Sequence, residues 1–155
     1  MLGFDFFLNA GLLARLYLEP SPFLLPPAEA FRRVPAGYLS FLMLTSLLVW
    51  LMERLGVSGW AKGLSFGLAL GAVVFGASLI ALWSIATASA LLLASWFVGQ
   101  TLQLGIAAAV AGSGLAGQRP LKLIVKVAAF VLLMAVATLA LQNAGLAPAI
   151  PISRS

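Results

Sequence analysis

Long apolar stretches dominate the chain, and the charged residues fall almost entirely between them. The longest uncharged stretch runs from position 63 to position 118. As one helix it would reach about 84 Å at about 1.5 Å per residue, whereas the hydrocarbon core of a bilayer is only about 30 Å thick. The stretch therefore predicts two membrane crossings. We place the turn at residues 84–89, where small and hydroxylated residues cluster.

The whole pattern predicts an all-α integral membrane bundle with four long transmembrane helices and a polar-striped N-terminal helix. The four long helices are expected at residues 36–52, 64–83, 91–111 and 123–141. In residues 2–18 and at the next position, four polar residues fall within an arc of roughly 120° at about 100° per residue: Asp5, Asn9, Arg15 and Glu19. We expect residues 2–18 to make a fifth crossing, with an interfacial position as the alternative. The chain is expected to form a single transmembrane domain, residues 1–155.

Residues 20–35 form a proline-rich segment that holds five of the eight prolines. We expect an interfacial elbow between two crossings, in which Arg32 and Arg33 contact lipid phosphates. A lid or docking surface on the non-cytoplasmic face is the alternative.

Composition supports a membrane protein. The chain is 63% hydrophobic and 8% charged, and its mean hydropathy is +1.11. Soluble domains carry roughly 25% charged residues, so a soluble fold would lack the polar surface to cover itself. The net charge of +5 indicates membrane topology and lipid contact, and we expect no nucleic-acid partner.

The absence of two residue types excludes several kinds of catalytic and metal site. Without cysteine or histidine the chain has no thiolate nucleophile, Ser-His dyad, His-ligated haem or Cys/His zinc site. Only four acidic residues are present, so paired-carboxylate catalysis is not expected. We therefore expect no enzyme, no cofactor and no metal.

Basic residues in the short loops predict the orientation. One side holds Arg54, Lys62, Arg119, Lys122 and Lys126, and the other holds Arg15, Arg32, Arg33 and Arg154. The excess predicts that the first side is cytoplasmic and, with five crossings, that the N-terminus is cytoplasmic. Lys122 and Lys126 are expected to extend to lipid head groups. The spans, rich in alanine, leucine and glycine, resemble those of short bacterial membrane proteins, and this resemblance implies the bacterial inner membrane.

Small residues recur at intervals of four on two of the expected helices. One face of the 64–83 span, together with the residue just before it, carries Gly63, Gly67 and Gly71. Gly76 lies on a neighbouring face. A matching series on the next span consists of Gly105, Ala109 and Ser113. Such stripes let helix backbones approach closely. The two stripes are expected to pack on each other within one hairpin, or alternatively against another chain.

A second pattern is polar. Trp96, Gln100 and Gln103 share one face of the 91–111 span. Buried amides need partners, so we expect hydrogen bonds to neighbouring helices or, alternatively, a polar pocket or pathway that also includes Asp5 and Asn9. Asp5 itself is expected near the cytoplasmic boundary.

Three functions follow as hypotheses. The first is a non-catalytic structural or accessory subunit of a membrane complex, or a homo-oligomer packed through the glycine stripes. The second is a small-solute channel or carrier with a glutamine-lined polar face. The third is a membrane protein that binds a lipid or another hydrophobic ligand. The expected partners are membrane lipids and either other membrane subunits or further copies of the chain.

Overall fold

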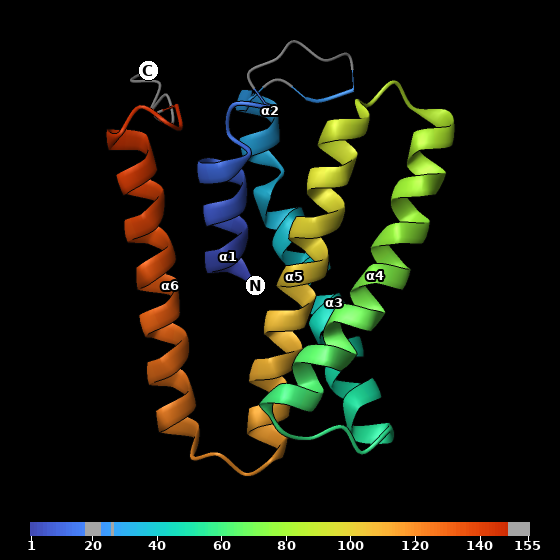
Figure 1. Cartoon of the computed structure of the whole chain (residues 1–155), viewed down its shortest axis with the longest axis vertical. Coiled ribbons are helices and arrows are strands. Elements are labelled where there is room, and N and C mark those ends of the chain that lie inside the picture. Colours follow the sequence, from blue (N-terminus) through green and yellow to red (C-terminus); the bar gives the residue numbers. More distant parts are fainter. Residues whose placement is uncertain (18–22, 26, 149–155) are drawn as a thin grey trace.

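Four long helices form the body of the protein in the computed structural model, which describes residues 1–17, 23–25 and 27–148. They are α3 (Val34–Arg54), α4 (Trp60–Ile85), α5 (Ala90–Leu115) and α6 (Pro120–Asn143). All four are long and apolar enough to cross a membrane, and the described residues contain no strand. The four predicted crossings are confirmed, each a few residues longer than expected. Neighbours in sequence run in opposite directions (Figure 1).

Local chemistry explains where the helices begin. The side chain of Ser89 accepts a hydrogen bond of 3.2 Å from the backbone N–H of Leu92, which caps α5 directly after the predicted turn. Pro120 stands in the first turn of α6, where a missing N–H costs nothing. Gly59 precedes α4 with a φ of +90°, a conformation that favours glycine. Its N–H donates to the carbonyl of Gly112 at 2.8 Å, which ties the α3–α4 loop to α5.

α5 lies at the centre of the bundle and contacts α1, α3, α4 and α6. The fully buried core lies between α3 and the half of α5 nearest the α5–α6 loop. It consists of Leu48 and Met52 from α3 with Leu104 and Ala108 from α5. The other helices are mostly apolar on their exposed faces, as expected of surfaces in contact with lipid.

The N-terminal helix is short. α1 (Leu2–Phe7) continues as a π-helix, η1 (Leu8–Leu12), and together they form what we call the N-terminal half-helix. Its residues reach about 16 Å at about 1.5 Å per residue, which is half of the hydrocarbon thickness. The half-helix begins midway along the bundle, between α5 and α6, and rises to the end of the bundle where α2 lies (Figure 1). Residues 2–12 alone therefore do not make the fifth crossing expected for residues 2–18.

Contacts with α6 explain this position. Gly3 lies so close to Val131 that an added Cβ would be 3.1 Å from the Val131 Cα. Further along, the Gln142 amide donates to the carbonyl of Ala10 at 3.3 Å, and Arg15 donates to the carbonyl of Gly145 at 2.6 Å. Residues 13–17 then form turns instead of continuing the helix.

The predicted elbow is only partly described. α2 (Pro27–Arg32) is a single short helix directly before α3, and Arg32 and Arg33 are exposed. Positions 20–22 and 26 of the elbow lie outside the described residues, as do Glu19 and Arg154.

Candidate functional site

The glycine stripe of α4 packs on α5 within the same chain. A Cβ on Gly67 would lie 2.5 Å from the Ala108 Cβ and 2.9 Å from the Gly105 Cα. A Cβ on Gly63 would collide with the backbone of Ala108, and one on Gly71 would lie 3.1 Å from the Thr101 Cα. Two helix backbones can approach this closely only without side chains between them.

The matching series on α5 has mixed roles. Gly105 lies under Leu68 of α4, with only 2.7 Å between its ideal Cβ and the Leu68 Cδ2. Ala109 and Ser113 line a groove described below, and the Ser113 hydroxyl donates to the Ala109 carbonyl at 2.9 Å. Gly76 has only the ring of Phe97 within contact distance, at 3.5 Å.

A chain of hydrogen bonds joins the N-terminal half-helix to α5. The Asn9 amide donates to the Asp5 carboxylate at 3.0 Å, and the Tyr17 hydroxyl donates to the Asn9 amide oxygen at 2.6 Å. The indole N–H of Trp96 donates to the Tyr17 oxygen at 2.7 Å. Asp5, Asn9 and Trp96 are thus brought together, but through Tyr17, which the sequence analysis missed.

The position of Asp5 differs from the expected one. α1 begins between α5 and α6, midway along them (Figure 1), so Asp5 lies inside the bundle rather than at the cytoplasmic boundary. Its carboxylate is half-buried and bonded to Asn9. Polar groups inside a protein or membrane are normally hydrogen-bonded, and the Asp5 carboxylate is hydrogen-bonded to the Asn9 amide.

The two glutamines do not join this chain of hydrogen bonds. Gln103 is only 1% exposed, and neither heteroatom of its amide has a hydrogen-bond partner among the described residues. Gln100 is half-buried. Polar side chains on the neighbouring helices α3 and α4 are engaged elsewhere: Ser40 and Ser78 donate to carbonyls of their own helices, and the Thr45 hydroxyl contacts the Met1 sulfur at 3.0 Å.

The larger of two grooves lies below the half-helix, between α5 and α6. This α5–α6 groove has a volume of about 750 Å³. Met1, Leu2 and Gly3 of the half-helix border it, and α5, α6 and the start of α4 supply most of its remaining, largely apolar lining. Its polar lining groups are few: Thr45, Ser113, Gln118 and Lys126. Because the half-helix begins midway along α6, the space beside the other half of α6 stays open.

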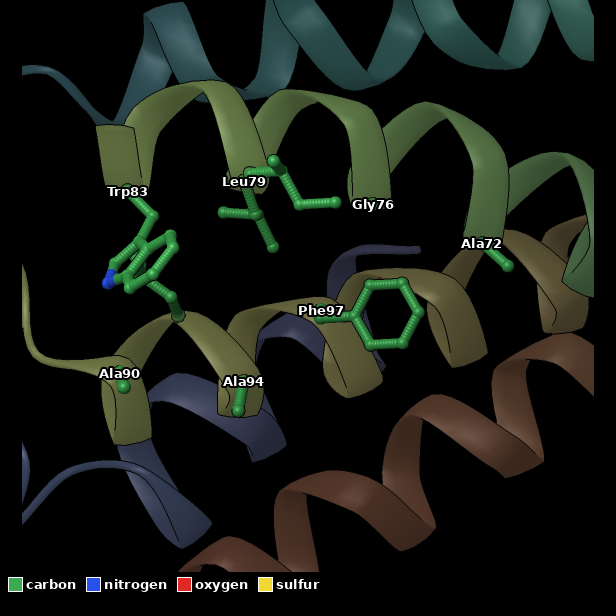
Figure 2. Close-up of a pocket in the computed structure, with 9 residues that line it drawn as sticks. Ala72, Gly76, Leu79, Trp83, Ala90, Ala94 and Phe97 are labelled. Atoms are coloured by element: carbon green, nitrogen blue, oxygen red, sulfur yellow. The ribbon is translucent and has the colours of Figure 1, made fainter. Parts of the chain in front are cut away.

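The smaller groove lies between α4 and α5, near the loop that joins them. This α4–α5 groove has a volume of about 580 Å³ and an almost wholly apolar lining. Small residues line its floor, and Trp83 and Phe97 border it from the two helices (Figure 2).

Of the four cations expected at head groups, only Lys126 lines a groove. Lys122 is exposed on α6, one turn before it, and lines neither groove. Arg32 and Arg33 are exposed at the opposite end of the bundle, near α2, and they also line neither groove (Figure 1). No ion pair joins Lys126 to an acidic side chain within the part of the chain that the structure describes.

These features describe a membrane protein with a helical bundle, with two apolar grooves formed by the described residues and with a short N-terminal helix that begins midway along the bundle. Comparison of the chain with protein-family models, with curated proteins and with solved structures gave no match.

Proposed function

We propose that this protein is a non-catalytic membrane protein that binds an anionic amphiphile in the α5–α6 groove. The observation that supports this proposal is a groove of about 750 Å³ with a largely apolar lining. Its polar lining groups are the side chains of Lys126 and Gln118 and the hydroxyls of Thr45 and Ser113. An acyl chain would occupy the groove, and the head group would meet the lysine. This proposal develops the third sequence hypothesis but moves the head-group site from Arg32 and Arg33 to Lys126.

Geometry supports an acyl chain as the occupant. The groove is bordered by the N-terminal half-helix midway along α6, so it spans about one leaflet. Trp60 lies near its other end, at the start of α4, and Gln118 lies in the α5–α6 loop. Tryptophan and glutamine suit the membrane interface, whereas the residues between suit hydrocarbon.

Charge supports an anionic head group. Lys126 lies about 9 Å along α6 from Pro120, at about 1.5 Å per residue, and its long side chain can extend to the interface. Lys122 and Arg119 lie between it and the loop, so a cationic head group would be repelled there. The same face holds Arg54 and Lys62. By the positive-inside rule we assign this face to the cytoplasm of a bacterial inner membrane, whose lipids include anionic ones.

The other hypotheses have less support. The glycine stripe of α4 is covered by α5 of the same chain, so an accessory subunit or homo-oligomer would need another surface. Gln100 and Gln103 line neither groove, so a solute pathway along them would need a rearrangement of α5.

The test is native mass spectrometry of delipidated protein in a neutral detergent, titrated with phosphatidylglycerol or phosphatidylcholine. Wild type should bind one phosphatidylglycerol preferentially. Lys126→Gln should lower that preference about fivefold, because one charge near an anionic surface contributes about 1 kcal/mol. Lys122→Gln is the matched control, since this lysine lies on the same helix but outside the groove. Equal effects of the two substitutions, or equal binding of the two lipids, would refute the proposal.

A second pair of variants tests the groove itself. Val127 lines the groove, whereas Val125 is exposed on α6 and does not. Val127→Trp should therefore reduce binding of both lipids, and Val125→Trp should leave it unchanged. Retained binding in Val127→Trp would show that the lipid binds elsewhere.

A further inference from the structure

The α4–α5 groove arises from a change of residue size along one pair of helices. Gly63, Gly67 and Gly71 hold the two backbones together near the α3–α4 loop. Beyond Gly71 the facing residues include Leu79 and Trp83 on α4 and Phe97 on α5. The two helices lie further apart toward the α4–α5 loop (Figure 1), and these residues line the groove between them.

The groove has a floor of small residues and aromatic borders. Ala90 and Ala94 on α5 and Gly76 on α4 leave the space open. Figure 2 shows the indole of Trp83 reaching from α4 toward Ala90 and Ala94, with the Phe97 ring further along α5, opposite Gly76. A flat ring between these residues would contact aromatic faces or edges from both helices, an arrangement that adds to simple burial.

Among the side chains that line this groove, only Trp83 carries a hydrogen-bonding group, its indole N–H. None of its lining residues is charged, and residues 84–89 beyond its end carry hydroxyls but no charge. The hydroxyls of Ser84 and Ser89 already bond to backbone groups. The indole N–H of Trp83 has no acceptor among the described residues, and the side chain is 64% exposed. Figure 2 shows the indole nitrogen on the ring edge turned away from Phe97, so the groove offers an apolar volume with one free N–H at the end near the α4–α5 loop.

We infer that the α4–α5 groove is a second ligand site, which binds an uncharged ring-headed amphiphile whose carbonyl accepts the Trp83 N–H, as a prenylated quinone would. The absence of charge disfavours an ionic head group, because no counter-ion is at hand. A volume of about 580 Å³ accommodates a substituted ring and the first part of a tail. This inference does not depend on the proposed function, since it concerns a different groove with different chemistry.

The test uses decylubiquinone as the probe and native mass spectrometry in a neutral detergent as the measurement. Two comparison probes separate the contributions: decylbenzene has the ring and tail without an acceptor, and laurate has a tail with an anionic head. Wild type should bind one molecule of decylubiquinone saturably. It should bind decylbenzene about threefold to tenfold more weakly, because one hydrogen bond is lost. Laurate should not displace bound decylubiquinone.

Three variants locate the site. Ala94→Phe fills the groove and should abolish binding of decylubiquinone, whereas Ala81→Phe, at an exposed position of α4 outside the groove, should not. If Ala94→Phe fails to fold, Gly76→Leu fills the same space with little steric cost. Trp83→Phe keeps a ring but removes the donor. It should therefore weaken decylubiquinone about threefold to tenfold and leave decylbenzene unchanged.

Other outcomes would overturn the inference. Binding that survives both filling variants would place the quinone elsewhere. Equal affinity for decylubiquinone and decylbenzene would remove the role of the Trp83 donor. Displacement by laurate at equal concentration would show that the groove does not select for an uncharged head.

Discussion

The two halves of α5 meet their neighbours in opposite ways. In the half near the α5–α6 loop, Ala108 lies against Gly63 and Gly67 of α4, and Gly112 lies against the backbone of Gly59 in the α3–α4 loop. Gly105 of the same half lies under Leu68 of α4. In the half near the α4–α5 loop, Phe97 borders an open groove, and Gly99 accommodates the side chain of Leu8 from the half-helix. On the side that faces α4, the first half is in close contact because side chains are absent there, whereas a groove separates the second half from α4. The α5–α6 groove lies on the other side of the first half.

This difference teaches how a small membrane protein can be both firmly packed and able to hold a ligand. Helices in lipid gain nothing from hydrophobic burial against each other, so close van der Waals contact must supply the stability. The glycine-lined half supplies it. The contact between α4 and the other half can then stay open, because the leucine, tryptophan and phenylalanine side chains that line the groove are at no disadvantage in hydrocarbon.

The largest effect is expected from breaking the closed half. Gly67→Leu would put side-chain atoms where the Ala108 Cβ and the Leu104 carbonyl now lie, and should lower the free energy of unfolding by about 3 kcal/mol or more. Unfolding in mixed micelles with increasing SDS measures this. Gly76→Leu is the control from the open half, and its cost should stay below about 1 kcal/mol, because only Phe97 lies within contact distance. Similar costs for both would contradict the comparison.

A smaller effect is expected from displacing the half-helix. Gly3→Leu should push α1 away from the Val131 backbone and cost about 2 kcal/mol. Hydrogen exchange of the α1 amides should then rise, which reports the displacement directly. Gly37→Leu on α3 is the control, since nothing lies within 4 Å of its ideal Cβ. Unchanged exchange in the Gly3 variant would mean that contact with α6 does not hold the half-helix.

Near the middle of α5, replacing one side chain should increase stability. Gln103→Leu removes an amide that is buried without a partner and should raise the free energy of unfolding by about 1 to 2 kcal/mol. Gln100→Leu should change it little, because that side chain is half-buried. The same SDS titration compares them. Destabilisation by Gln103→Leu would indicate that the amide has a partner in the membrane, such as a bound ligand.

The smallest effect concerns the end of the open half. Ser89→Ala removes the acceptor for the Leu92 N–H and should cost about 0.5 to 1 kcal/mol. Ser89→Asp keeps an acceptor at this position and should recover most of the loss. A cost as large as that of Gly67→Leu would show that the open half, too, depends on precise local structure.

The sequence predicted the fold well, because crossings follow from length and apolarity alone. The turn at residues 84–89 follows from short-range chemistry, because small and hydroxylated residues cluster there. The facing small-residue stripes also follow from helical spacing, although spacing leaves open whether the partner helix belongs to the same chain. Only the structure places Gly67 against Ala108 of α5.

The grooves and the half-helix could not be predicted in this way. A groove depends on how far two helices separate, which is decided by side chains such as Trp83 and Phe97 acting across the bundle rather than by any periodicity. Tyr17 was overlooked because its partners, Asn9 and Trp96, lie far apart in the sequence. The role proposed for Lys126 rests on the short N-terminal helix, and composition could not distinguish this lysine from Lys122.

The contacts between Gly3 and Val131 and between Arg15 and Gly145 set an order of events during biosynthesis. At about 5–20 residues per second, a ribosome reaches position 131 roughly 6 to 25 s after position 3. Throughout that interval the half-helix, with its carboxylate at Asp5, has no α6 to pack on. We expect it to wait at the membrane surface or within the insertion machinery, and to enter the bundle only after α6 has been made, although it is synthesised before α6.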